Sequence, residues 1–145
     1  MIPMIEVTDT PSDDARRAVI DGLVAFNQAA VPWPTPRPLP LAVSLSDPAT
    51  GAYVGGLIGA THWGQCHVDL LYVPENLRGA GWGTQVMRAA EAEAVKRGCV
   101  GIWLDTFSFQ ARGFYERLGY QVFGQIDNYP AGTARFFLMK KLLSP

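Results

Sequence analysis

The chain has 145 residues, of which 48% are hydrophobic and 17% are charged, and its formal net charge is −1. This length and composition indicate one globular domain over residues 1–145 and exclude a disordered chain. The near-neutral charge offers no binding surface for nucleic acid or an anionic membrane, and no apolar run is long enough to span a bilayer.

The first residues carry no evident export signal. Residues 1–6 lack the basic region and the cleavage pattern of a signal peptide. Cys66 and Cys99 are too few for a disulfide framework. We therefore expect a reduced, cytoplasmic protein.

In the first third of the chain, the pattern predicts a strand, a helix and an irregular segment. Residues 2–7 are expected to form a short strand. Ser12 is a good N-cap for a helix, because apolar residues follow it at helical spacing: Ala15, Val19, Leu23, Phe26 and Ala30. The proline-rich residues 31–40 cannot be helical. They either border a substrate entrance or serve only as a stiff connector.

The middle of the chain predicts three strands and a helix. Strands are expected at residues 39–45, 53–63 and 67–73, with a turn between the first two. The second of them contains glycines at positions 55, 56 and 59. Glycine inside a strand indicates a bulge or the close approach of another backbone or a ligand. The helix is expected at residues 82–97, and Gly98 is its stop.

The last third predicts a buried strand at residues 99–105 and a short helix at residues 110–118. Two more strands follow at residues 120–126 and 134–139. The complete order of elements indicates an α/β domain with a mixed sheet.

A glycine-rich turn with one cation joins the third strand of the middle region to the long helix. Gly79, Gly81 and Gly83 let the backbone bend and let a ligand approach the amides. The start of the helix then suits an anion such as a phosphate. No lysine follows these glycines, as a P-loop would need, and Thr84 stands where a dinucleotide fingerprint has its third glycine. The remaining pattern is Arg-x-x-Gly-x-Gly, which begins at Arg78.

A second motif, Phe-Tyr-Glu-Arg-Leu-Gly-Tyr, spans residues 114–120. The two motifs, in this order and spacing, resemble those of the GNAT superfamily of N-acetyltransferases, whose second motif is commonly written Leu-Tyr-Glu-Lys-Leu-Gly-Phe. The superfamily prefaces it with Asn-x-x-Ala-x-x. Ala111 matches the alanine, whereas Ser108 occupies the asparagine position. This departure puts the usual side-chain contact to the CoA arm in doubt, and Ser108 or Gln110 is the expected substitute. The resemblance covers roughly residues 53–145.

The resemblance implies an α/β (α+β) fold: a mixed, mostly antiparallel, twisted sheet of about seven strands, flanked by three to four helices. Its central parallel pair, residues 67–73 and 99–105, would splay apart and admit acetyl-CoA. Backbone groups at the end of the first of these strands would pair with the pantetheine arm, and the amides of the glycine turn would bind the pyrophosphate. The residues implied in acetyl-CoA binding are Leu71, Tyr72, Val73, Arg78, Gly79, Ala80, Gly81, Trp82, Gly83, Thr84, Ser108, Gln110, Ala111, Phe114 and Tyr115.

The implied reaction is direct attack of an amine on the thioester, and the sequence itself offers no convincing nucleophile for an acyl-enzyme. Deprotonating a lysine-like amine at pH 7 costs roughly 4–5 kcal/mol, so a base is useful. His67 and Asp69 alternate along one strand, share a face and are the candidate bases, although either could be a satisfied structural group. Tyr115 is the candidate acid for the departing thiolate, against a role as a core tyrosine.

The leading hypothesis is an acetyl-CoA-dependent N-acetyltransferase that acts on a primary amine of a small molecule. The alternatives are a non-catalytic acyl-CoA-binding sensor and a protein lysine or N-terminal acetyltransferase. No metal is expected, because the spacing of His62, Cys66 and His67 matches no familiar zinc site. A homodimer is compatible with the resemblance. The identity of the amine depends on loops such as residues 31–40 and 127–133.

Overall fold

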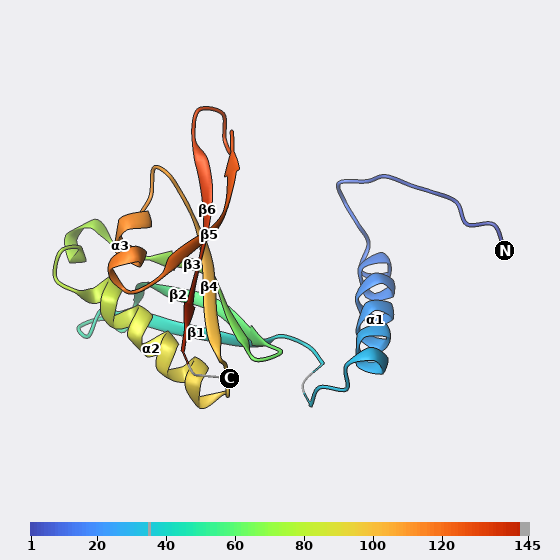
Figure 1. The fold of residues 1–145 in the computed structure, drawn as a ribbon, viewed down its shortest axis with the longest axis horizontal. Coiled ribbons are helices and arrows are strands. Elements are labelled where there is room, and N and C mark those ends of the chain that lie inside the picture. The colour runs from blue at the N-terminus through green and yellow to red at the C-terminus, as the bar shows by residue number, and fades with distance from the viewer. Residues whose placement is uncertain (35, 143–145) are drawn as a thin grey trace. The chain divides into compact units, whose positions relative to one another are not determined.

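The structure is a computed structural model that describes residues 1–34 and 36–142. They belong to two compact units, Met1–Arg37 and Pro38–Pro145. Figure 1 shows one helix in the first unit and a sheet with its helices in the second. Thr35, in the predicted proline-rich loop, lies outside the described residues.

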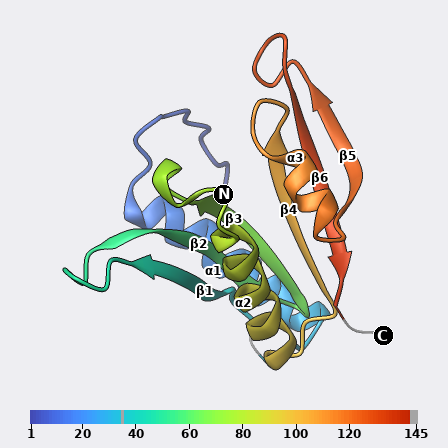
Figure 2. The ribbon, with the colours of Figure 1, turned by 90° about the vertical axis from the view of Figure 1, so that its left-hand side faces the viewer.

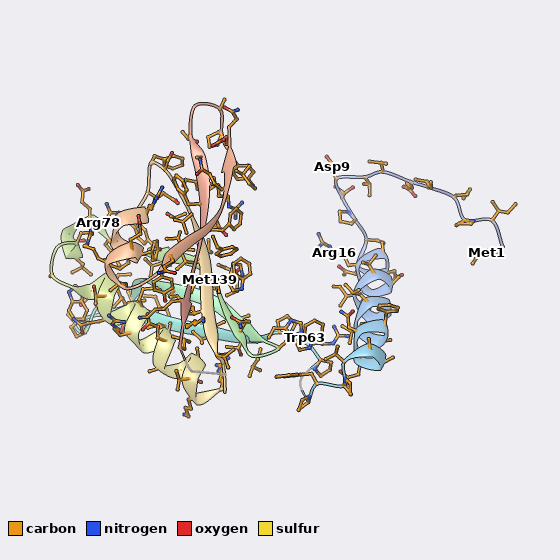
Figure 3. All side chains as sticks on the ribbon, in the orientation of Figure 1. Met1, Asp9, Arg16, Trp63, Arg78 and Met139 are labelled. Atoms are coloured by element: carbon orange, nitrogen blue, oxygen red, sulfur yellow. The ribbon has the colours of Figure 1, made fainter. Side chains whose placement is uncertain are left out.

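The first unit is built around helix α1 (Asp13–Ala30). The Ser12 hydroxyl accepts a hydrogen bond from the amide of Ala15 at 3.1 Å, so the predicted N-cap and helix are confirmed. The strand predicted at residues 2–7 is wrong. The chain runs there as an irregular segment, between the labelled Met1 and Asp9 in Figure 3, and pairs with no described strand. An apolar pattern becomes a strand only where a neighbour supplies the ladder of hydrogen bonds, and Pro3 removes one donor.

The second unit contains a six-stranded sheet in the order β1-β2-β3-β4-β6-β5. The pairing of β3 with β4 is parallel, and the other pairings are antiparallel. This confirms the expected mixed, mostly antiparallel sheet, with six strands instead of about seven because the N-terminal one is not formed. The strands are β1 (Leu39–Ser46), β2 (Tyr53–His62), β3 (Gln65–Tyr72), β4 (Gly101–Phe107), β5 (Gln121–Asp127) and β6 (Ala134–Lys141).

Helices α2 (Trp82–Lys96) and α3 (Arg112–Arg117) lie on the same side of this sheet, as Figures 1 and 2 both show. A short 3-10 helix, η1 (Glu75–Leu77), precedes α2. The core lies between α2, α3 and the sheet. Alternation along β4 turns Ile102, Leu104 and Thr106 towards that core and turns Trp103, Asp105 and Phe107 to the opposite face.

A buried carboxylate also ties α2 to the sheet. The Glu91 side chain is only 10% exposed and accepts hydrogen bonds from the Tyr120 hydroxyl at 3.0 Å and from the Lys140 ammonium at 3.1 Å. Arg88 completes the set with a bond of 2.9 Å from its guanidinium. Buried charges are stable only when they are paired in this way. Nothing in the spacing along the chain predicts this network.

Candidate active site

The central feature of the second unit is the point where β3 and β4 separate. Their parallel pairing runs from Gln65 opposite Gly101 to Val68 opposite Leu104, and it ends there although both strands continue. Figure 2 shows the two strands diverging beyond this point. The unpaired ends of β3 and β4 therefore form a V-shaped opening in the sheet. The backbone groups of Leu71 and the residues after it face this opening without a partner on β4.

A β-bulge lies at the apex of this opening. Ile58 pairs with Leu70 and Gly59 pairs with Val68, so Asp69 is the extra residue on β3. A Cβ atom at Gly59 would collide with the carbonyl oxygen of His67. The prediction of a bulge or a close backbone approach at the strand glycines is confirmed, and both occur at the same place.

The glycine turn enters α2 in a conformation that leaves its amides accessible. Gly79 and Gly81 have φ angles of 77° and 85°, in the left-handed region that favours glycine. Gly81 is the N-cap and has no side chain to cap the helix. Because the first intrahelical bond is made by the amide of Gln85, the preceding amides have no helical partner. Arg78 donates from Nε to the Val73 carbonyl at 2.9 Å, which links the turn to the end of β3.

Helix α3 lies close behind this turn. The ring of Phe114 is 3.2 Å from the position that a Cβ atom would take at Gly83, so a side chain there would require the ring to shift by a few tenths of an ångström. Tyr115 is buried beside it, with its ring edge-on to Phe114 at a centroid distance of 5.1 Å. Burial and the negative charge of Asp105 raise the pKa of Tyr115 to about 12. Among the described residues, its hydroxyl has no hydrogen-bond partner.

A cluster of charged side chains occupies the other face of the sheet at the apex. His67 Nδ1 lies 2.9 Å from Asp69 Oδ1, so these two side chains share a face as expected. His67 Nε2 lies 4.0 Å from Asp105 Oδ2. Asp105 Oδ1 in turn accepts a hydrogen bond from Arg135 Nε at 2.8 Å, and it forms an ion pair with Nη2 of the same guanidinium at 2.6 Å. The Arg135 guanidinium also donates to the Tyr129 hydroxyl at 2.9 Å.

Comparison with known proteins places this geometry in a family. Residues 14–120 match the model of the acetyltransferase (GNAT) family. The chain belongs to the GNAT acetyltransferase family. It is therefore an acyltransferase, and the resemblance seen in the two sequence motifs is confirmed.

Three similar proteins illustrate the relationship. Blasticidin-S acetyltransferase of Streptomyces morookaense is 41% identical over 107 residues, which are 73% of this chain and 79% of that protein. A crystal structure from Agrobacterium tumefaciens, assigned as an acetyltransferase, is 32% identical with a TM-score of 0.87 over 96% of this chain and 99% of its own. An aminoglycoside 6′-N-acetyltransferase complexed with coenzyme A shares the fold, at 18% identity and a TM-score of 0.65 over 94% of this chain and 97% of its own.

Two residues predicted to contact the cosubstrate, Ser108 and Gln110, also make hydrogen bonds within the protein. The Ser108 hydroxyl accepts a hydrogen bond from the Ala134 amide at 3.2 Å, which holds the end of β4 to β6. Gln110 Oε1 accepts from the Thr106 hydroxyl at 3.2 Å and from the Phe107 amide at 2.9 Å. Each side chain still has a donor for a ligand, because the hydroxyl hydrogen of Ser108 and the amide group of Gln110 are not used in these bonds.

The sequence analysis missed Asp105 and Arg135. Asp105 is the first residue of β4 beyond the parallel pairing, and its side chain faces His67. Its negative charge also helps to raise the pKa of Tyr115. The signal that could have identified it was present, because a carboxylate ends an otherwise apolar strand of the predicted parallel pair. Arg135 lies on β6 and comes next to Asp105 only through the pairing of β6 with β4.

Over residues 1–34 and 36–142, no group of three or more His, Cys, Asp or Glu side chains could hold a metal ion. In the same part of the chain, no helix is long and apolar enough to cross a membrane.

Proposed function

We propose that this GNAT acetyltransferase moves the acetyl group of acetyl-CoA directly to a primary amine of a small molecule in a ternary complex, without an acyl-enzyme. The observation that carries this proposal is the apex where β3 and β4 separate. His67 lies there between Asp69 and Asp105, and the negative charge of Asp105 also helps to raise the pKa of the buried Tyr115. A proton donor and a proton acceptor at one opening fit the two proton transfers of aminolysis.

The opening suits an extended thioester cosubstrate. The backbone of Leu71, Tyr72 and Val73 has no partner on β4, and on that side it can hydrogen-bond the pantetheine arm as an additional strand would. The amides from Gly79 to Thr84, with the start of α2, supply donors and a positive dipole end for the pyrophosphate, whereas the Arg78 amide already donates to the Glu75 carbonyl at 3.1 Å. When bound, acetyl-CoA supplies the acetyl group as an activated thioester.

The properties of the cysteines support direct transfer. Cys66 and Cys99 are both buried, and burial, followed by the nearby Cys99, raises the pKa of Cys66 to about 11. A thiol with such a pKa is almost entirely protonated at pH 7 and is a weak nucleophile. The amine itself is then the nucleophile, and Tyr115 protonates the sulfur as the carbon–sulfur bond breaks.

A small-molecule acceptor is favoured by the relatives. One similar protein is named for acetylating blasticidin S, and a protein with the same fold is named for acetylating aminoglycosides. Transfer to a protein lysine or N-terminus and a non-catalytic sensor role are the alternatives. A sensor would bind acetyl-CoA without turning over any amine. We further infer a single acetyltransferase domain over residues 1–145 that works in the cytoplasm, and leave a homodimer as a prediction.

The proposal is tested first by calorimetric titration of the full chain with acetyl-CoA, with dephospho-CoA and ATP as controls. Micromolar binding that prefers acetyl-CoA is expected. Thiol release is then followed over a panel of amines that includes blasticidin S, an aminoglycoside and a lysine-containing peptide. Absence of acetyl-CoA binding would refute the proposal, and binding without turnover on any amine would favour the sensor role.

A further inference from the structure

The ring of His67 is held in one orientation at the apex of the opening. It stacks on Trp103 of the neighbouring strand, with ring centroids 3.8 Å apart and planes inclined by 17°. Its Nε2 atom is buried and has no hydrogen-bond partner among the described residues. The nearest charged oxygen, Asp105 Oδ2, is 4.0 Å away, which is too far for a hydrogen bond.

The neighbouring carboxylate determines which nitrogen of His67 has the lone pair. Asp69 Oδ1 lies 2.9 Å from Nδ1. A negative oxygen at this distance attracts a proton to Nδ1 and repels a lone pair there, so the neutral ring carries its hydrogen on Nδ1. Nε2 is then an acceptor, and it faces a second acceptor on Asp105.

Asp105 is held so that one of its oxygens stays available. The hydrogen bond from Arg135 Nε, at 2.8 Å, and the ion pair with Arg135 Nη2, at 2.6 Å, both involve Oδ1. Arg135 is fixed by its bond to the Tyr129 hydroxyl, and its guanidinium lies 5.4 Å and 5.0 Å from the ring centroids of Phe107 and Tyr129. Oδ2 therefore points from a rigidly held carboxylate towards His67.

We propose, on the basis of the acetyl transfer proposed above, that His67 Nε2 and Asp105 Oδ2 together bind the acceptor as an ammonium ion, and that the rest of this acceptor is a planar, apolar group. An ammonium nitrogen about 2.9 Å from each atom completes a triangle on their 4.0 Å separation and donates one hydrogen bond to each. His67 and Asp105 are then catalytic residues, and Asp69 and Arg135 are positioning residues.

A groove beside this pair suits a flat, apolar group. It has a volume of about 390 Å³ and lies along the same face of β4, β5 and β6. Trp103, which stacks on His67, forms one wall, and Figure 3 labels Met139 at another. The groove is lined by Gln65, Trp103, Phe123, Phe137 and Met139.

The charges near the groove favour a cationic acceptor. Two carboxylates, Asp69 and Asp105, and one guanidinium, Arg135, leave an excess of negative charge. The aromatic rings add negative faces that attract a cation. A carboxylate on the acceptor next to its amine would therefore weaken binding.

The protons balance along this route. The ammonium loses one proton to His67 Nε2, and the neutral nitrogen attacks the acetyl carbon. The carbon–sulfur bond then breaks, and Tyr115 gives a proton to the leaving sulfur. The second proton lost by the nitrogen restores the Tyr115 hydroxyl. The products are an amide and CoA thiol, and the proton on His67 passes to solvent.

The acceptor class is tested with three matched amines on the full-length chain and acetyl-CoA. Phenylethylamine has a cationic amine and a flat ring, phenylalanine adds a carboxylate, and ethylamine lacks the ring. We expect kcat/KM for phenylethylamine to exceed that for either of the others by at least about tenfold. If acetyl-CoA binds but phenylethylamine is neither acetylated nor bound, the assigned class is wrong while the proposed function stands. If acetyl-CoA does not bind, the proposed function itself fails.

The roles of the two residues are tested with Asp105→Asn and His67→Gln. Asp105→Asn keeps the shape and the bond to Arg135 but loses the charge, so KM for the amine should rise at least about tenfold. His67→Gln should lower kcat/KM about 100-fold at pH 7, within the usual range for a general base. Asp47→Asn is the control, because this half-buried carboxylate accepts a backbone bond in the turn before β2 that the amide can keep.

The pH profile separates a base from a structural histidine. The groups that face His67 are Asp69 on its own strand and Asp105 on β4. Arg135 is paired with Asp105, and the charge of Asp105 also acts on Tyr115. Without a base, turnover depends on the free amine, so the deficit of His67→Gln should shrink to less than about tenfold at pH 9.5. A deficit that stays constant from pH 7 to 9.5, or an unchanged KM in Asp105→Asn, would overturn the assignment.

Discussion

Replacing Tyr115 by phenylalanine removes one oxygen from a buried ring and leaves the packing in place. The ring contacts Phe114 and Tyr120 edge-on, at centroid distances of 5.1 Å and 6.1 Å. Because its hydroxyl has no hydrogen-bond partner among the described residues, no bond within the folded protein is broken. We expect the free energy of unfolding to change by less than about 1 kcal/mol.

The effect on turnover should be much larger, and its size follows from the acidity of the hydroxyl. The pKa of Tyr115 is about 12, whereas an ordinary thiol has a pKa of about 8.5. Complete proton transfer to a free thiolate would be uphill by about 5 kcal/mol. Tyr115 must therefore give its proton while the carbon–sulfur bond is breaking, before a free thiolate has formed. We expect kcat to fall about 100-fold, at the lower end for general acids, with unchanged affinity for acetyl-CoA.

Tyr120→Phe is the matched control. Its hydroxyl donates to the buried Glu91 at 3.0 Å. Its loss should cost about 1–3 kcal/mol of stability and leave kcat within about threefold. Thiol-release kinetics and urea unfolding of both variants give the comparison. The reasoning fails if Tyr115→Phe turns over within threefold of the wild type, or if it loses more stability than Tyr120→Phe.

Three further predictions concern stability. Glu91→Ala leaves three donors around a buried site unpaired and should cost about 3–5 kcal/mol, or about 10 °C in thermal unfolding; a loss under 1 kcal/mol would contradict this. The pKa of Tyr115 is raised from 10.0 to about 12 in the folded protein. The protonated hydroxyl therefore contributes fully to the free energy of unfolding below pH 10, and this contribution is lost as the pH rises to 12. Urea unfolding at pH 9 and pH 12 should show about 2 kcal/mol more loss in wild type than in Tyr115→Phe, and equal losses would refute it. Gly59→Ala should lower the free energy of unfolding by about 1–3 kcal/mol, because its methyl group would meet the His67 carbonyl. Gly22→Ala has open space in α1 and should raise the free energy of unfolding by up to about 1 kcal/mol. Chemical denaturation of both variants gives the comparison.

Sequence reasoning succeeded where a feature depends on neighbouring residues. The N-cap at Ser12, the glycine turn before α2 and the buried strand that becomes β4 follow from local chemistry and composition. It failed where a feature needs a partner from elsewhere in the chain. The segment at residues 2–7 has the composition of a strand, but no described strand pairs with it.

The candidate site shows the same division. His67 and Tyr115 stand out because they occupy recognisable positions in their strand and motif. Asp105 gains its importance from its closeness to His67 and Arg135 and from the effect of its charge on Tyr115, and each of these residues comes from a different element. The second bonding role of Ser108 was equally hidden, since its partner Ala134 is 26 residues further along the chain.

The bulge at Asp69 has a consequence for changes in chain length. If Asp69 were deleted, β3 would alternate without interruption, with Val68 and Leu71 facing the core and Leu70 and Tyr72 facing away. The shortened strand would match β2 along its whole length, and it would be a regular strand with a complete hydrophobic pattern. A deletion in a strand normally damages the fold more than a substitution does. Here, deletion of Asp69 should leave the fold intact and remove the carboxylate beside His67. Asp69 can thus be regarded as a one-residue insertion in β3 that the sheet accommodates as a bulge and that places a carboxylate beside His67.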